Sequence, residues 1–236
     1  GLVGSEMCIR DRCINASGRL DTAEHSLKLL CAKTREEAAK LAGDLKDLNE
    51  SRKELTRQGE AKAIELVETS PLQNDKVLVV YLPDCHESLA GIIAGRLREH
   101  FHKPSFVLTR SEEGVKGSGR SIEAYSMYEE LCKCKELMTK FGGHPMAAGL
   151  SLAGEEMIEP FRRALNDNCT LTEEDFVEKV VIDVPMPITY ITKNLIRQLS
   201  LLEPFGKGNT KPLFAQKGLT VLNLSLIHIS EPTRPY

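Results

Sequence analysis

The chain has 236 residues and an ordinary globular composition, 41% hydrophobic and 28% charged, with no apolar run near the ~20 residues of a membrane span, so we expect a soluble protein. Its seven cysteines lack the spacing of a disulfide framework and follow no charged-then-apolar leader, which favours a cytoplasmic location over secretion. A formal net charge of −3 excludes a general attraction for nucleic acid, so any polyanion site has to be local.

Both ends of the chain resemble foreign sequence. Residues 1–12, GLVGSEMCIRDR, and residues 225–236, SLIHISEPTRPY, resemble translated sequencing-adapter sequence. Neither segment shows a helix or strand periodicity that continues into its neighbour. We therefore exclude both from the fold argument and expect native sequence from about Cys13 to Leu224. Two native, frayed termini are the alternative.

A long helix is predicted over residues 34–70. Thr34 and Glu37 have the spacing of a capping box, and apolar residues then recur at helical spacing. Such a helix is about 50 Å long at 1.5 Å per residue, although Gly43 and Gly59 weaken it. This length is typical of a connection between two bodies.

The next segment predicts strands that alternate with helices. KVLVVYL (76–82) and SFVLTR (105–110) are predicted to be strands, and ESLAGIIAGRLREHFH (87–102) is an amphipathic helix that stops before Pro104. This alternation indicates an α/β layer. Two further helices are predicted, one with a capping box formed by Ser126 and Glu129 and one over residues 154–167.

A third region begins near Phe176. It contains a predicted strand, EKVVIDVPM (178–186), a predicted helix, TKNLIRQLSLLE (192–203), and a second predicted strand, PLFAQKGLTVLNL (212–224). The loop PFGKGNTKP separates the helix from the second strand. These elements predict the beginning of another small module.

The segment GVKGSGRS has two possible roles. It has P-loop spacing except that Arg120 stands where lysine belongs, and the next helix cap waits until Ser126, which argues against an NTPase. Gly117 and Gly119 allow backbone N–H groups to converge on an anion, with Ser118 as a neutral donor and Arg120 as a bidentate one. A hairpin turn with a surface arginine is the equally supported alternative.

The segment FGGHPMAAGL is the second candidate for phosphate binding. His144 can donate a ring N–H, and Gly142 and Gly143 before it allow a ligand to come close to the backbone. Gly149 follows in the same segment. A structural histidine near a turn is the alternative.

Two groups of potential metal ligands are assigned no metal. Cys132 and Cys134 are two residues apart on a predicted helix, so they point to different faces, and no second pair accompanies them. The run Asp84–Glu87 opens a predicted helix and serves more simply as its cap and first turn.

Several of these motifs together resemble one protein family. FGGHPMAAGLSL resembles the Gly-Gly-His-x-x-Ala-Ala-Gly signature of the DHH-associated domain. KGSGRSIEAYSMYEEL is similar to the segment that precedes this signature in the RecJ family of single-strand-specific exonucleases, within the DHH phosphoesterase superfamily. INASGRL (14–20) resembles the end of that family's catalytic domain, and LLEPFGKGNTKPLF (201–214) resembles the opening of its OB-like domain.

The resemblance implies a fold class and a set of domains. The fold class is α/β: a DHH-associated domain with a central β-sheet flanked by helices, after a long connecting helix and before a partial OB-like β module. The implied boundaries are 13–33 for the end of the DHH catalytic domain, 34–70 for the connecting helix, 71–170 for the DHH-associated domain and 171–224 for the partial OB-like domain.

The resemblance also implies substrate-binding residues. Those that match the family's motifs for the 5′-terminal phosphate are Arg19, Ser118 and Arg120, and those that match its strand-binding motif are Gly142, Gly143, His144 and Gly149. In place of the family's Trp-His-Pro-Gly, this chain has Cys-His-Glu-Ser from Cys85 onward.

The implied function is that of a fragment of an exonuclease that degrades single-stranded DNA from its 5′ end. The intact enzyme uses Mn²⁺ or Mg²⁺ to hydrolyse the phosphodiester. The chain contains no Asp-His-His triplet and no Asp-x-Asp motif, so we assign it no catalytic residue and no metal, and expect it to be inactive alone. Single-stranded DNA is the implied partner, with a single-strand-binding protein and a helicase as partners by family.

Two alternative functions stay open. One is a DHH phosphodiesterase that acts on short oligonucleotides or cyclic dinucleotides, and the other is a non-catalytic module that binds nucleic acid or tRNA. The long helix and the Pro-Phe-Gly segment at 204–206 favour the exonuclease, because small relatives join their domains briefly and stop after the associated domain.

Overall fold

The computed structural model describes residues 23–177, 179–206 and 208–220, and these form two compact units, one that ends at Val177 and one after it. The predicted foreign ends and the stretch 14–20, which includes Arg19, lie outside the described residues. Within the described part, no helix has the length and apolar character needed to cross a membrane.

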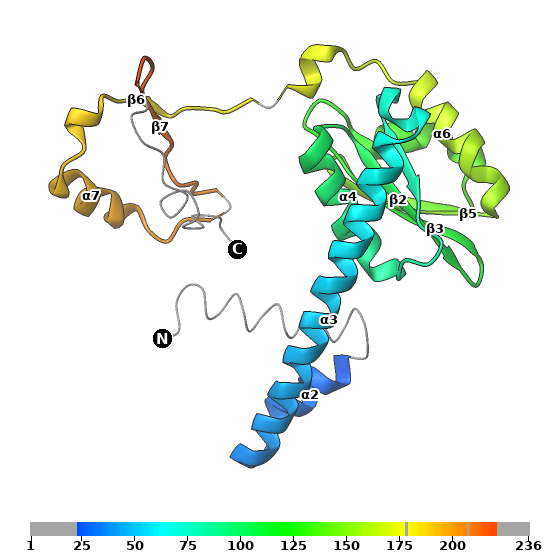
Figure 1. Ribbon diagram of the computed structural model, residues 1–236, viewed down its shortest axis with the longest axis horizontal. Coiled ribbons are helices and arrows are strands. Elements are labelled where there is room, and N and C mark those ends of the chain that lie inside the picture. The colour runs from blue at the N-terminus through cyan, green and yellow to red at the C-terminus, as the bar shows by residue number, and fades with distance from the viewer. Residues whose placement is uncertain (1–22, 178, 207, 221–236) are drawn as a thin grey trace. The chain divides into compact units, whose positions relative to one another are not determined.

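Two helices begin the described chain (Figure 1). Helix α2 spans Ala23–Cys31, and helix α3 spans Arg35–Glu68, 34 residues or about 50 Å, which confirms the predicted long helix. Thr34 Oγ1 accepts a hydrogen bond from the backbone N–H of Glu37 at 3.2 Å. The Glu37 carboxylate accepts from Lys33 N–H instead of Thr34 N–H, so the predicted capping box closes one residue early.

A five-stranded sheet with the order β1-β2-β3-β5-β4 forms the centre of the first unit. Its strands are β1 (Leu78–Tyr81), β2 (Ser105–Ser111), β3 (Gly114–Arg120), β4 (Lys140–His144) and β5 (Ala147–Leu152). Strands β1 and β2 are joined through helix α4 (Glu87–Phe101), as predicted. They pair in parallel, whereas the other pairs of this sheet are antiparallel.

The two faces of the sheet are covered differently. Helices α5 (Met127–Lys133) and α6 (Ile158–Asp167) supply Met127, Leu131 and Phe161 to the core on one face, together with Phe106 and Leu108 of β2. On the other face, α3 and α4 pack over Leu78, Val80 and Val107 of β1 and β2. Strand β4 is largely exposed on this second face, which we call the open face.

The segment Gly114–Arg120 differs from its prediction, because it is neither a nest nor a hairpin turn but the central strand β3. Every residue of β3 is paired with β2, so its backbone N–H groups point along the sheet and do not converge. A Cβ atom on Gly119 would lie 2.6 Å from Phe106 Cε1 and 2.7 Å from Met127 Sδ. The glycine is therefore needed to admit large core side chains.

Two other predicted features differ in detail. Ser126 is the N-cap residue of α5, but its side chain makes no capping hydrogen bond, so the predicted box with Glu129 does not form. In the second unit, the described parts of the two predicted strand segments contain β6 (Val184–Pro185) and β7 (Phe214–Ala215), which pair in parallel, and the predicted helix is present as α7 (Lys193–Leu199). Residues 178 and 221–224 of the predicted segments lie outside the described residues.

Gly43 and Gly119 are expected to respond in opposite ways to substitution by alanine, as measured by the free energy of unfolding. Gly43 lies in α3 with nothing within 4 Å of an added Cβ, so Gly43→Ala is expected to raise the free energy of unfolding by about 0.5–1 kcal/mol. Gly119→Ala is expected to lower it by about 1–3 kcal/mol because the core is already filled. Denaturant unfolding of both variants tests this, and equal effects would contradict it.

Candidate functional site

The open face presents three rows of residues across neighbouring strands. Residues directly opposite one another in an antiparallel pair share a face of the sheet. Across β3, β5 and β4 these rows are Lys116–Ser151–Lys140, Ser118–Gly149–Gly142 and Arg120–Ala147–His144. Val107 of β2, which packs beneath α4, is opposite Ser118 and fixes these rows on the open face.

The register brings most of the predicted site residues together. Those on the open face are Ser118, Arg120, Gly142, His144 and Gly149. Gly143 is the exception, because it is opposite Ala148 and faces the core. Its φ of 153° and the 2.6 Å approach of Ala148 Cα to an added Cβ explain this glycine by backbone geometry alone. Arg19 lies outside the described residues.

The middle row forms a trough without side chains except for Ser118. An added Cβ on Gly142 would meet nothing within 4 Å, and one on Gly149 would meet only the Gly117 carbonyl oxygen at 3.8 Å. Neither glycine has a positive φ. Because glycine weakens a strand and packing does not require it here, the trough is suited to the close approach of another molecule.

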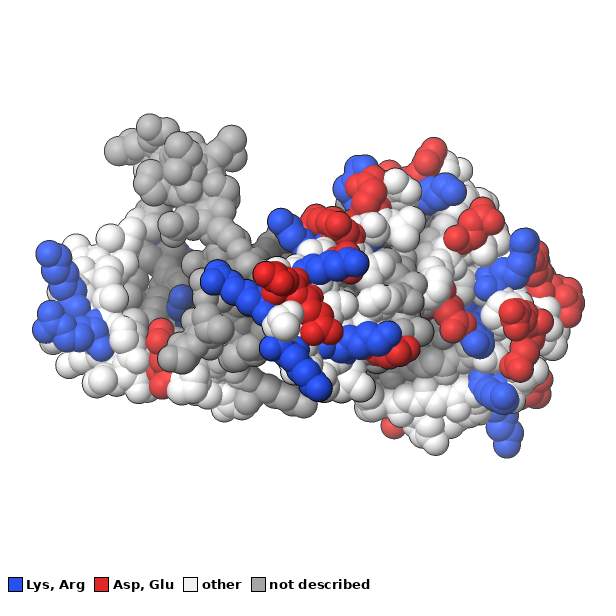
Figure 2. Space-filling view, turned by 90° about the horizontal axis from the view of Figure 1, so that it is seen from below, with Lys and Arg blue, Asp and Glu red and all other residues white. Residues whose placement is uncertain are grey.

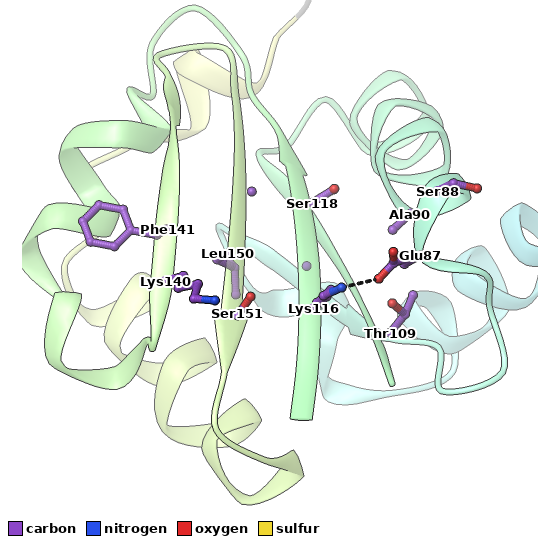
Figure 3. Close-up of a pocket in the computed structure, with 12 residues that line it drawn as sticks. Glu87, Ser88, Ala90, Thr109, Lys116, Ser118, Lys140, Phe141, Leu150 and Ser151 are labelled. Atoms are coloured by element: carbon purple, nitrogen blue, oxygen red, sulfur yellow. Dashed lines mark hydrogen bonds and ion pairs between the residues drawn. The ribbon is translucent and has the colours of Figure 1, made fainter. Parts of the chain in front are cut away.

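A groove of about 360 Å³ (Figure 3) lies between the first turn of α4 and strands β3, β5 and β4, and Ser118 and Gly149 of the trough line it. Lys116 and Lys140 line it, and the sequence analysis assigned neither residue to the site. Lys116, Ser118 and Arg120 occupy alternate positions, which is typical of the polar face of a strand. If the segment is assigned to a strand, this pattern places Lys116 on the same face as Ser118 and Arg120.

Arg120 is held against helix α4. Its Nη1 donates a hydrogen bond to the Gly119 carbonyl at 2.7 Å, and an added Cβ on Gly91 of α4 would lie only 2.7 Å from its Nη2. The absence of a side chain at Gly91 therefore makes room for the guanidinium, which is partly exposed. A guanidinium held in this way is suited to bidentate contact with a phosphate or carboxylate.

His144 ends strand β4 at the exposed edge of the open face. Its Nδ1 accepts a hydrogen bond from the backbone N–H of Met146 at 3.3 Å across the β4–β5 turn. The neutral ring therefore carries its proton on Nε2, which makes Nε2–H a donor for a ligand.

The two lysines of the open face differ in their partners. Lys116 Nζ lies 2.8 Å from Glu87 Oε2 at the start of α4, and this hydrogen bond raises the pKa of Lys116 above its usual value. Lys140 makes no ion pair with any residue that the structure describes. Figure 2 shows basic and acidic side chains mixed over the face that it displays, in line with the net charge of −3.

The described residues do not fit a metal centre. No group of three or more His, Cys, Asp or Glu side chains in this part of the chain is placed to hold an ion. His86 caps α4 by accepting from Ser88 N–H, as the helix-cap interpretation predicts. Burial raises the pKa of the Cys134 thiol to about 11, which disfavours the thiolate that a metal needs. We therefore derive no reaction step through a metal from these residues.

Comparison with known proteins identifies two adjacent domains. Residues 74–170 match the DHHA1 domain, and residues 182–231 match the RecJ OB domain. The second match extends into the segment 225–236 that the sequence analysis predicts to be foreign.

Curated relatives and solved structures agree with these matches. The chain is 36% identical over 203 residues to the single-stranded-DNA-specific exonuclease RecJ of Bacillus subtilis, covering 84% of this chain and 26% of the relative. It is 35% identical over 211 residues to the Escherichia coli RecJ, covering 85% and 36%. The crystal structure of RecJ in complex with Mg²⁺ from Thermus thermophilus superposes with a TM-score of 0.76 at 31% identity, covering 86% of this chain and 31% of that chain.

The chain thus spans only 26% to 37% of the curated relatives that it matches. Its mixed α/β fold, a central sheet flanked by helices followed by an OB domain, is that of the matching part of the Thermus protein. A second Thermus structure, in complex with Mn²⁺, gives a TM-score of 0.74. With the DHHA1 and RecJ OB domains in succession and these relatives on both, the chain belongs to the RecJ family.

Proposed function

We propose that this chain is the strand-binding part of a RecJ-type exonuclease, which degrades single-stranded DNA from its 5′ end by metal-dependent phosphodiester hydrolysis. The observation that carries the proposal is the glycine trough of the open face, bordered by Arg120 and His144 on one side and by Lys116 and Lys140 on the other. The relatives' names, which specify single-stranded DNA, support the substrate class.

The groups on this face suit the backbone of a single strand. Arg120 offers a fork of N–H donors to a 5′-terminal phosphate, and Ser118 offers a hydroxyl from the neighbouring row. His144 offers Nε2–H to a phosphodiester farther along the strand. Gly142 and Gly149 allow the sugar-phosphate chain to approach the sheet. Arg19 is proposed to complete the terminal-phosphate site.

Other features of the whole enzyme are part of the same proposal. We propose that a DHH domain supplies the Mn²⁺ or Mg²⁺ site, that residues 71–170 and 171–224 act as the DHH-associated and OB-like domains, and that the enzyme works in the cytoplasm. A single-strand-binding protein and a helicase are its proposed partners. The metal ions in the solved relatives support the metal dependence.

This chain alone is expected to hydrolyse no single-stranded DNA in Mn²⁺ or Mg²⁺. Without a metal-bound hydroxide, positioning of the phosphodiester leaves its hydrolysis too slow to detect. The measurement is release of nucleotides from a labelled oligonucleotide by the purified chain. Metal-dependent release that follows the chain through purification would contradict the expectation.

Arg120→Ala is expected to weaken binding of a 5′-phosphorylated oligonucleotide by about 1–3 kcal/mol, and of its 5′-hydroxyl twin by much less, because Arg120 is assigned to the terminal phosphate. His144→Ala is expected to weaken both equally, because His144 is assigned to an internal phosphodiester. Fluorescence anisotropy at two salt concentrations measures both, and each loss should shrink as salt rises.

Equal losses for the two oligonucleotides with Arg120→Ala would remove the terminal-phosphate role. No loss with either variant would show that the open face does not hold the strand. Because an isolated chain lacks the contacts of the whole enzyme, the same pair of variants in a full-length relative provides the matched comparison.

Gly142→Val is expected to block the trough without unfolding the protein. The added side chain enters open space, and valine favours a strand more than glycine does, so the thermal midpoint should not fall. Binding of single-stranded DNA should weaken about tenfold or more because the backbone can no longer reach the sheet. Gly43→Ala in α3 is the control, and unchanged binding by Gly142→Val would refute the trough.

A further inference from the structure

An ion pair between two lining residues stands in the groove on the open face. Glu87, the first residue of α4, lies 2.8 Å from Lys116 of β3, as the dashed line in Figure 3 shows. Both side chains are about half exposed, at 50% and 45%. Exposed ion pairs of this kind are among the weakest in proteins, so an incoming anion can displace the carboxylate from the ammonium.

Lys116 is part of a basic row rather than an isolated surface lysine. Ser151 lies opposite Lys116 on β5, and Lys140 lies opposite Ser151 on β4. A hydroxyl therefore stands between two ammonium groups on adjacent strands. Neighbouring strands are about 4.8 Å apart, so one phosphodiester over Ser151 is within reach of both long side chains.

Thr109 of β2 extends the same row, because it lies opposite Lys116. Its side chain is fully buried and lines the groove, and its Oγ1 has no hydrogen-bond partner among the residues that the structure describes. A buried hydroxyl without a partner costs free energy, so a polar group that enters the groove beside Glu87 and reaches this atom would be stabilised by it.

We infer that Lys116, Ser151 and Lys140 form a second phosphodiester subsite, and that Glu87 takes the place of the phosphate on Lys116 when no strand is bound. The inference rests on the proposed function and adds to it a site and its regulation. Lys116 lies four residues from Arg120 on β3, about 13 Å at 3.3 Å per residue, so the phosphate at this subsite is distinct from the terminal one.

The displaceable carboxylate has a consequence for affinity. A DNA strand that enters the subsite replaces Glu87 as the partner of Lys116, and the Glu87 carboxylate is then left beside the sugar-phosphate backbone. Glu112 and Glu113 also lie close enough for their charges to act on Lys116. Glu87 therefore weakens binding at this subsite, and removing its charge should strengthen binding.

The test measures binding of a 5′-hydroxyl oligothymidylate by fluorescence anisotropy at low and high salt. The 5′-hydroxyl end removes the terminal phosphate from the comparison. Glu87→Gln is expected to tighten binding about three- to tenfold at low salt, and Lys116→Gln to weaken it by a similar factor. In the Glu87→Gln/Lys116→Gln double variant, the effect of Glu87→Gln is expected to disappear.

Glu50→Gln is the matched control. Glu50 pairs with Lys53 on α3 at 2.8 Å with similar exposure, and the substitution changes the net charge equally, yet neither residue lines the groove. Its expected effect on affinity is none. The thermal midpoint of each variant separates loss of binding from loss of structure.

The outcomes distinguish failure of the subsite from failure of the proposed function. No tightening with Glu87→Gln, or equal tightening in the absence of Lys116, would overturn the subsite while leaving the proposed function intact if Arg120→Ala still weakens binding. An effect of Glu50→Gln equal to that of Glu87→Gln would also overturn it. Absence of binding by every variant, Glu87→Gln included, would overturn both.

Discussion

Strand β3 faces a full hydrophobic core on one side and a candidate ligand on the other, and the first unit depends on how its sequence divides these two sides. Val115, Gly117 and Gly119 face the core, and the two glycines leave room for large neighbours such as Phe106 and Leu150. Core packing at native density leaves no room for a side chain at these positions. Lys116, Ser118 and Arg120 therefore lie on the open face. Because β3 pairs with β5 and β5 pairs with β4, the residues opposite them on those strands lie on the same face.

Helix α4 determines how much of the open face is available. It packs over β1 and β2 through an apolar face that includes Ile93 and Leu97, and it stops short of β5 and β4. Gly91 on this helix lies against the Arg120 guanidinium, so one element both covers the parallel part of the sheet and positions a cation at the edge of the exposed part. The boundary between core and groove is therefore the line along which α4 meets β3.

The sequence predicted the elements whose side chains have a clear period. In helix α4, apolar residues recur at helical spacing, which predicts an amphipathic helix. Strands β1 and β2 contain short continuous apolar runs, which predict buried strands. Strand β3 was missed because its core-facing positions are glycines, which carry no hydrophobic signal and are typical of turns. The chemistry of Ser118, Arg120 and His144 and the neighbouring glycines makes them candidate site residues, and the family resemblance adds Arg19 and a role for each. Their common face is not predictable in this way, because it follows from strand register, which no local pattern contains.

The same register explains why glycine alone is a poor guide to function. Among the glycines of the five-stranded sheet, Gly117 and Gly119 are required by the core and Gly143 by its backbone conformation. Within this sheet, only Gly142 and Gly149 stand where an added Cβ would meet open space or ordinary contact. Glycine costs a strand conformational entropy, so a glycine that neither packing nor backbone geometry requires points to something outside the chain. Gly142 and Gly149 lie opposite each other on neighbouring strands, in the row between the two lysines on one side and the arginine and the histidine on the other, and Gly149 lines the groove. A row without large side chains between two such borders fits a linear polyanion better than a single compact ion.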